Sequence, residues 1–249
     1  AGDQRLMFNR VAYWAASPAL LFTTVATSDA ATFISPVVVV VFIATAITMV
    51  VFWVISRLFF QADVPTRMAG AASASYFNSV NIGLPIAIYV IGDAAYMPPV
   101  LLMQMVIVSP IVIAGLTADP TSPGSRGRNV WEAVKSGLTA PVVVAPLLGL
   151  VFASMEWTLP DPVMAPLEIL AGASIPMILM SFGASLRGGA VLSPGPDRPA
   201  TITASILKLM VMPAIAWVIG ALAGLEGSAL YAAVILSALP TAQNVYNYT

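Results

Sequence analysis

The sequence predicts an all-α polytopic membrane protein. Of its 249 residues, 59% are hydrophobic and only 8% are charged, whereas a soluble domain carries about a quarter charged residues. Long apolar stretches alternate with short polar ones along the whole chain, and a helix needs about 20 apolar residues to cross a bilayer. Parts of the first half also recur in the second half. The lipid bilayer is therefore the first expected partner.

The composition excludes several functions. The chain has no cysteine and no histidine, and its net charge is −1. These counts exclude disulfides, the usual zinc and haem ligands and histidine-based acid–base chemistry, and they give no reason to expect nucleic-acid binding. The motifs His-Glu-x-x-His and Gly-x-Ser-x-Gly are absent. We expect no enzyme activity, no metal and no cofactor.

Hydropathy divides the chain into helical segments that span residues 6–27, 36–60, 66–91, 97–116, 130–155, 162–186, 200–223 and 228–244. The polar stretch 119–128 reads as a cytoplasmic linker between a first half, 1–118, and a second half, 129–249. The chain starts without Met and stops before the eighth segment could complete a span. We therefore expect an earlier helix and a C-terminal end beyond this sequence.

The charges orient these helices. If the first segment starts in the cytoplasm, every basic residue lies on the cytoplasmic side: Arg5, Arg10, Arg57, Arg67, Arg126, Arg128, Lys135, Arg187, Arg198 and Lys208. The charged residues of the outer turns are then all acidic: Asp29, Asp93, Glu156, Asp161 and Glu226, with Glu168 near the outer end of its helix. This distribution follows the positive-inside rule.

The two halves resemble each other at an offset of about 160 residues. Pro18 and Pro176 each follow a serine within a helix, Pro36 and Pro199 each open one, and a break at Pro85 has its counterpart at Pro240. An odd number of helices per repeat makes the second copy run in the opposite direction. With one helix missing at the front, the pattern predicts two inverted five-helix repeats.

Two stretches should interrupt their helices. The run 78–85 (Asn-Ser-Val-Asn-Ile-Gly-Leu-Pro) and the run around Pro240 combine proline, asparagine and, in the first, glycine within apolar surroundings. In lipid, a broken helix survives only where protein or a polar cavity satisfies the freed backbone groups. Interrupted helices at equivalent positions of inverted repeats are typical of secondary transporters, with the substrate near the midplane.

These residues carry a family resemblance. The run 81–87 (Asn-Ile-Gly-Leu-Pro-Ile-Ala) resembles the first crossover motif of the auxin efflux carrier family, which includes bacterial relatives of the plant PIN proteins, and 239–246 (Leu-Pro-Thr-Ala-Gln-Asn-Val-Tyr) resembles the second. The runs 17–22 and 180–186 are also similar to that family. The resemblance implies ten helices in two inverted repeats. This chain would hold helices 2–5 and 6–9, the ninth incomplete, with helices four and nine crossing. It also implies a scaffold and a moving transport domain.

Carried over by motif, the resemblance implies that the first crossover contains Gly83 and Pro85 and the second contains Pro240. The expected substrate-binding residues are Asn78, Asn81, Thr241, Gln243 and Asn244. The alternative for each is that its side chain only satisfies the broken backbone. Two breaks at equivalent repeat positions favour the binding role.

Other polar residues within the helices favour structural roles. We expect Lys208 to extend its ammonium to the membrane surface, as lysines near helix ends do. With no other basic side chain at the breaks, helix dipoles would then be the available attraction for an anion. Gln104 fits an interhelical hydrogen bond at least as well as substrate contact. Ser17 and Ser174 fit bonds to carbonyls of their own helices better than a cavity lining.

The most specific prediction is that the protein transports small organic anions (carboxylates similar to auxin, malate or malonate) across the cell membrane by alternating access. A homodimer through the scaffold helices is a further expectation. One alternative is a sodium-coupled organic-anion symporter of similar fold, which carboxylates near the crossover would favour; none is visible. The other is a non-transporting membrane sensor or subunit, which an added soluble domain would favour.

Overall fold

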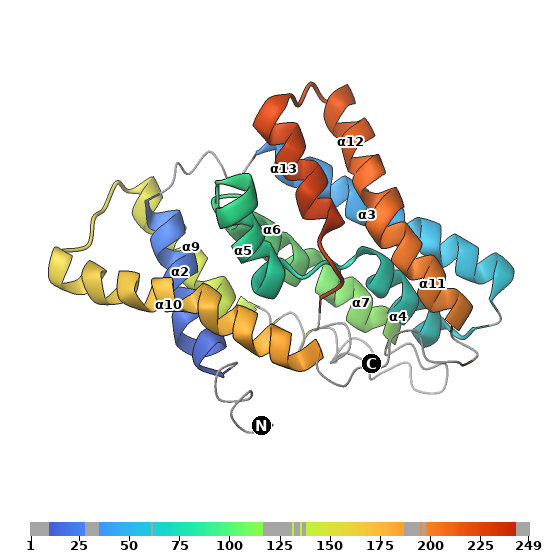
Figure 1. Cartoon of the computed structure of the whole chain (residues 1–249), viewed down its shortest axis with the longest axis horizontal. Coiled ribbons are helices and arrows are strands. Elements are labelled where there is room, and N and C mark those ends of the chain that lie inside the picture. Colours follow the sequence, from blue (N-terminus) through green and yellow to red (C-terminus); the bar gives the residue numbers. More distant parts are fainter. Residues whose placement is uncertain are drawn as a thin grey trace.

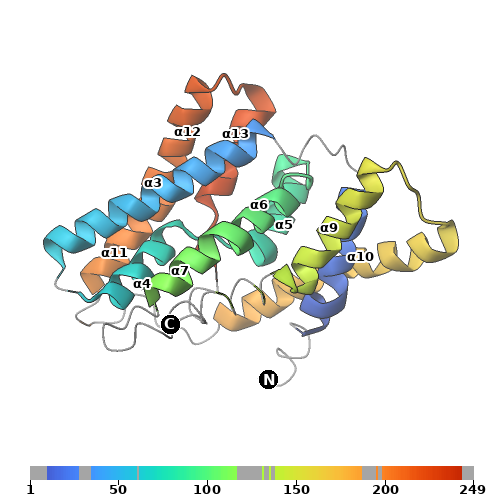
Figure 2. The same cartoon turned by 180° about the vertical axis from the view of Figure 1, so that it is seen from behind.

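The computed structural model describes residues 10–27, 35–60, 62–116, 131, 135, 138–186, 195 and 198–242. These residues form helices joined by turns, plus one isolated pair of bridged residues, so the chain is an all-α membrane protein, as predicted. Figure 1 shows one group of helices, α2, α9 and α10, beside a larger group that contains α3, α4, α11, α12 and α13. The helices α5 and α6 lie between the two groups in this view and from behind in Figure 2.

The smaller group contains helices from both halves of the chain. It consists of the π-helical turn η1 (Ala12–Ala16), α2 (Ser17–Ala26), α9 (Pro141–Ser154) and α10 (Asp161–Leu186). Helix α2 packs against both α9 and α10. Gly149 makes the α2–α9 contact close, because a Cβ there would stand 2.8 Å from the Phe22 carbonyl oxygen. Small residues at such contacts are typical of packed membrane helices.

The larger group contains α3 (Pro36–Phe59), α4 (Val64–Ser75), α11 (Arg198–Ile206), η6 (Leu207–Val211), α12 (Met212–Leu222) and α13 (Gly227–Ala238). Helix α3 begins as its sequence predicts: Pro36 occupies the first turn, and the Ser35 hydroxyl accepts the Val37 N–H at 3.3 Å. Asp63 caps α4 in the same way through the Thr66 N–H at 2.9 Å. Helix α3 packs on α4, α12 and α13, which makes it the central element of this group.

Two further segments that contain π-helical turns lie between the groups. The first runs through η3 (Ser79–Gly83), α5 (Leu84–Ile86) and η4 (Ala87–Ile91), and the second through α6 (Met97–Met103), η5 (Gln104–Val108) and α7 (Ser109–Leu116). The π-helical turns stand just before or after prolines inside the helices. Such turns adjust the hydrogen-bond ladder where proline cannot donate.

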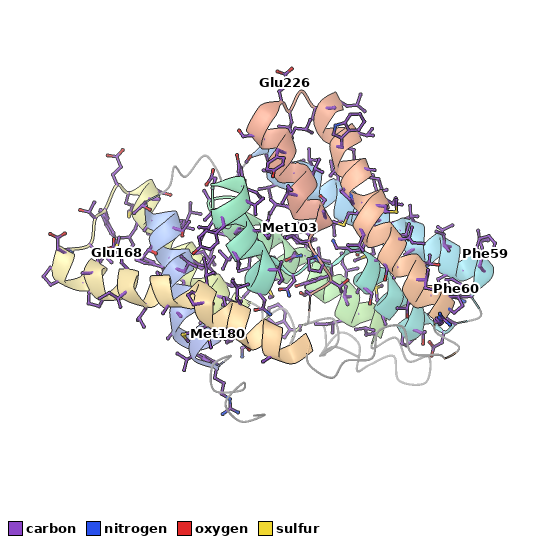
Figure 3. The ribbon with its side chains drawn as sticks, viewed as in Figure 1. Phe59, Phe60, Met103, Glu168, Met180 and Glu226 are labelled. Carbon is purple, nitrogen blue, oxygen red and sulfur yellow. The ribbon has the colours of Figure 1, made fainter. Side chains whose placement is uncertain are left out.

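Among the described residues, four helices are long and apolar enough to cross a membrane: Pro36–Phe59, Met97–Leu116, Asp161–Ser181 and Arg198–Leu222. These agree with four of the predicted segments. On α3, the exposed residues Val39, Ile43, Val50 and Val54 form an apolar stripe suited to lipid. Figure 3 shows Glu226 in the turn between α12 and α13.

Three predicted helix bounds are wrong. The segment 130–155 is not one helix: Thr139 and Ala140 form a turn, and Ala140 is extended (ψ 135°) because Pro141 follows it and starts α9. The segment 66–91 breaks earlier than expected. The segment 228–244 ends as a helix at Ala238. The break in the segment 66–91 and the helix end at Ala238 lie at the candidate site.

Candidate functional site

The first interrupted helix breaks at residues 76–78. Helix α4 ends at Ser75, Tyr76 is extended (φ −79°, ψ 110°), and helical structure resumes at Ser79 after Asn78. The predicted residues Gly83 and Pro85 lie in the resumed helix and not in the break. Pro85 directly follows the π-helical turn η3 inside a continuing helix, and such a turn accommodates the missing proline N–H. Gly83 is needed for packing, because a Cβ would stand 2.6 Å from Met97 Cε and 3.2 Å from the Asn78 carbonyl oxygen.

The second interrupted helix meets the first at this break. Helix α13 ends at Ala238, and Pro240 lies in the extended stretch that follows, as predicted. Phe77 and Thr241 form an antiparallel bridge. The Asn78 N–H donates to the Pro240 carbonyl at 2.8 Å, and the Ala242 N–H donates to the Tyr76 carbonyl at 3.1 Å. Each broken backbone therefore satisfies the other, as a membrane interior requires.

The two arms of the crossing have matching bounds in the two halves of the chain. Val64 and Gly227 begin two arms of 12 residues each, and Ser75 and Ala238 end them. Both pairs are 163 positions apart, so Pro240 corresponds to Phe77 and not to Pro85. The predicted pairing of the two prolines was therefore shifted by two helical turns.

Side chains satisfy the carbonyls that the two arms leave free. The Thr241 hydroxyl donates to the Ser73 carbonyl at 2.6 Å. The Gln104 amide donates to the Phe77 carbonyl at 2.9 Å, while its oxygen accepts the Ser79 hydroxyl at 2.5 Å. Gln104 is fully buried, and its interhelical role is confirmed. Thr241, a predicted substrate residue, holds the crossing together in this structure.

The two asparagines of the first motif lie beside the crossing. The Asn78 side-chain oxygen accepts the Asn81 N–H at 3.0 Å and so caps η3. The Asn78 side-chain nitrogen is buried and has no hydrogen-bond partner among the described residues. Asn81 is partly buried, and its side chain makes no hydrogen bond within the described residues. Since η3 packs against α10, these amide groups lie where the two groups of helices meet. Gln243 and Asn244 lie outside the described residues.

This crossing of two interrupted helices is the arrangement that the sequence motifs imply. A model of the membrane transport protein family, which is that of the auxin efflux carriers, matches residues 1–124 and 127–249. The chain belongs to this family. No curated protein matches the sequence. The family is one of membrane transporters.

One residue of this carrier lies where the sequence did not place it. Lys208 is only 2% exposed, so the expectation that it reaches the membrane surface is wrong. Its Nζ donates to the Ser237 carbonyl at 3.2 Å and to Met212 Sδ at 3.1 Å. It also lies 4.9 Å from the centre of the Phe77 ring. A cation therefore lies next to the crossing, and helix dipoles are not the only attraction for an anion there. Its depth in the helix was a signal, but the sequence does not show which face is covered.

A cavity of about 530 Å³ adjoins the crossing of this transporter. It lies between α4 and α11, and the crossing residues Pro240 and Thr241 form part of its wall. The polar side chains in the wall are Thr66, Ser73, Thr201, Ser205, Lys208 and Thr241, with no Asp or Glu among the lining residues. The charge of this wall therefore suits an anion better than a cation.

Proposed function

We propose that this family member is a secondary transporter of small organic anions such as mono- and dicarboxylates. The observation that supports this most directly is the crossing itself: two interrupted helices are bridged at Phe77 and Thr241, and no described residue accepts a hydrogen bond from the buried Asn78 amide nitrogen. A buried N–H without an acceptor is costly. A substrate carboxylate would provide that acceptor, since carboxylates bind strongly to N–H donors.

Asn78 and Asn81 have different roles at this site: Asn78 provides a fixed donor and Asn81 a movable one. Asn78 is fixed by its bond to the Asn81 backbone, so its free nitrogen points in a defined direction. The Asn81 side chain is partly exposed and unbonded within the described ranges, so it can turn toward a solute. Together they would offer amide donors to one carboxylate. Thr241 contributes by holding the crossing, and Gln243 and Asn244 remain predicted contacts.

Alternating access would move one group of helices against the other. The packing between α2, α9 and α10 joins them into one unit, and α3, α4, α12 and α13 pack into another. The η3 segment with the asparagines packs against α10 of the first unit. Movement at this boundary would open the amide groups to one side and then to the other, as in other crossed-helix carriers. A cell-membrane location and a homodimer through α2, α9 and α10 belong to this proposal.

Uptake into liposomes tests the proposal. Reconstituted protein should take up at least one radiolabelled carboxylate from a panel of malonate, malate and indole-3-acetate, above protein-free liposomes. Asn81→Ala should abolish uptake while the protein stays folded. Asn78→Asp should also abolish it, because the substituted side chain keeps the oxygen that caps η3 but places a carboxylate beside the substrate. Ser154→Ala, at the exposed end of α9, is the control. Unchanged uptake by folded Asn81→Ala and Asn78→Asp proteins would refute the site.

A further inference from the structure

Lys208 is a buried cation, and no described residue provides it with an anionic partner. Its acceptors are a carbonyl oxygen and a thioether sulfur, and no carboxylate forms an ion pair with it within the described ranges. An ammonium has three N–H donors, and its remaining described neighbour is the uncharged Phe77 ring, 4.9 Å away. Charged side chains inside a membrane protein are costly and generally functional. The structure must therefore gain something from the Lys208 charge.

The crossing explains why a cation is needed there. Both α4 and α13 end at the crossing with their C-termini, and each helix C-terminus carries roughly half a negative elementary charge. The resumed helix has its positive N-terminus at Asn78, but the two C-terminal ends would repel a carboxylate held there. The Lys208 ammonium donates to the Ser237 carbonyl in the last turn of α13 and lies over Phe77, which is in the bridge. It therefore offsets the negative ends at the point where they meet.

The repeat register shows that this charge belongs to one half only. At the offset of 163 positions that relates α4 to α13, the counterpart of Lys208 is Thr45. The Thr45 hydroxyl donates to the Val41 carbonyl of its own helix at 2.8 Å. A single ammonium thus serves the pair of crossing helices, and the backbone symmetry alone would not provide it.

We propose that Lys208 determines the charge selectivity of the crossing: its ammonium offsets the two helix C-termini, so that the asparagines can hold a carboxylate. This inference rests on the proposed function and adds a positioning residue that acts through the electrostatic field. The cavity whose wall includes Lys208 gives small molecules a route to its position. That access makes a charge-specific test practical.

The first test compares Lys208→Met, which removes the charge at similar length, with Lys208→Arg, which retains it. In liposomes, Lys208→Met should raise the KM for the carboxylate that the wild-type protein takes up. The increase should be at least about tenfold, which corresponds to a free-energy change of RT ln 10. Arg should keep uptake within about threefold of wild type on the same scale. Equal KM values for folded Met and wild-type proteins would overturn the inference.

The second test restores the charge without the side chain. Lys208→Ala should lose uptake, and n-propylammonium should restore part of it, because this cation replaces the atoms removed beyond Cβ. The uncharged analogue 1-propanol should restore none. Equal rescue by both compounds would show that Lys208 only fills space, and rescue by neither in folded protein would show that restoring the charge does not restore uptake. Either result would overturn the inference.

The two proposals fail in distinguishable ways. If the wild-type protein takes up no carboxylate of the panel, the proposed function falls and this inference falls with it. If wild-type uptake is clear and depends on Asn81, but not on the charge at position 208, only the inference about Lys208 fails. If Lys208→Met does not fold, the rescue of Lys208→Ala and the activity of Lys208→Arg still decide the matter.

Discussion

The hydroxyl oxygens of Ser17 and Ser174 lie 3.1 Å apart, although 157 positions separate the two residues. Both are buried, one in α2 and the other in α10, and each comes shortly before a proline. We expected each hydroxyl to bond within its own helix, but the structure pairs them. A serine from each half of the chain is thus in direct contact with the other, which ties α2 to α10.

This contact predicts a measurable coupling. Ser17→Ala and Ser174→Ala should each lower stability, and the double variant should lose less than the sum of both. The coupling should be about 0.6 kcal/mol, the average for hydrogen bonds between membrane helices. Unfolding in SDS mixed micelles, followed by tryptophan fluorescence, measures it through a double-mutant cycle. Strictly additive losses would show that the two hydroxyls do not stabilise each other.

Thr241 should be a structural residue of the crossing. Its hydroxyl donates to the Ser73 carbonyl at 2.6 Å, so Thr241→Val, which keeps the shape, leaves that carbonyl without this donor. Stability should fall by about 1 kcal/mol. Thr241→Ser keeps the donor and should lose much less. The same micelle unfolding assay compares them, and a stable Val variant with altered substrate KM would instead favour a direct substrate contact.

The sequence predicted the arms of the crossing better than the crossing itself. Pro36 marks a helix start and Pro240 marks a break because proline restricts the backbone wherever it stands. These effects are local and can be read from single residues. The same rule misplaced the first break at Pro85, since a π-helical turn accommodates that proline inside a continuing helix.

The first break has no local cause in the sequence. Tyr76 and Phe77 are good strand or helix residues, and they are extended because Thr241 and its neighbours pair with them. A contact between such distant residues is a tertiary effect that propensity cannot predict. The burial of Lys208 is a similar case: it depends on Phe77 and Ser237 from other elements.

Acid should weaken the start of α4. Asp63 is exposed and outside the helix, and its pKa is lowered from its usual range chiefly by the hydrogen bond from Thr66. A carboxylate with a lowered folded-state pKa stabilises the protein above its unfolded pKa, and this contribution disappears as pH falls through the folded value. Wild-type stability should therefore drop below about pH 4, the unfolded value of Asp.

Asp63→Asn gives the matched control, since asparagine also caps helices but does not titrate. Unfolding measured between neutral and acidic pH should show a smaller pH-dependent loss for Asn than for wild type. Identical pH profiles for the two proteins would mean that the Asp63 cap does not contribute to acid sensitivity.

The contact between α2 and α9 should tolerate no side chain at Gly149. A Cβ there would lie 2.8 Å from the Phe22 carbonyl oxygen and 3.0 Å from Val25 Cβ, and backbone cannot move aside as a flexible side chain can. Gly149→Ala should therefore destabilise the protein by about 2 kcal/mol, as overpacking does in well-packed interiors. Gly172→Ala is the matched control on α10, because nothing lies within 4 Å of its added Cβ. Unfolding of both variants in mixed micelles should separate them clearly, and equal stability would mean that α2 and α9 are packed less closely than the structure shows.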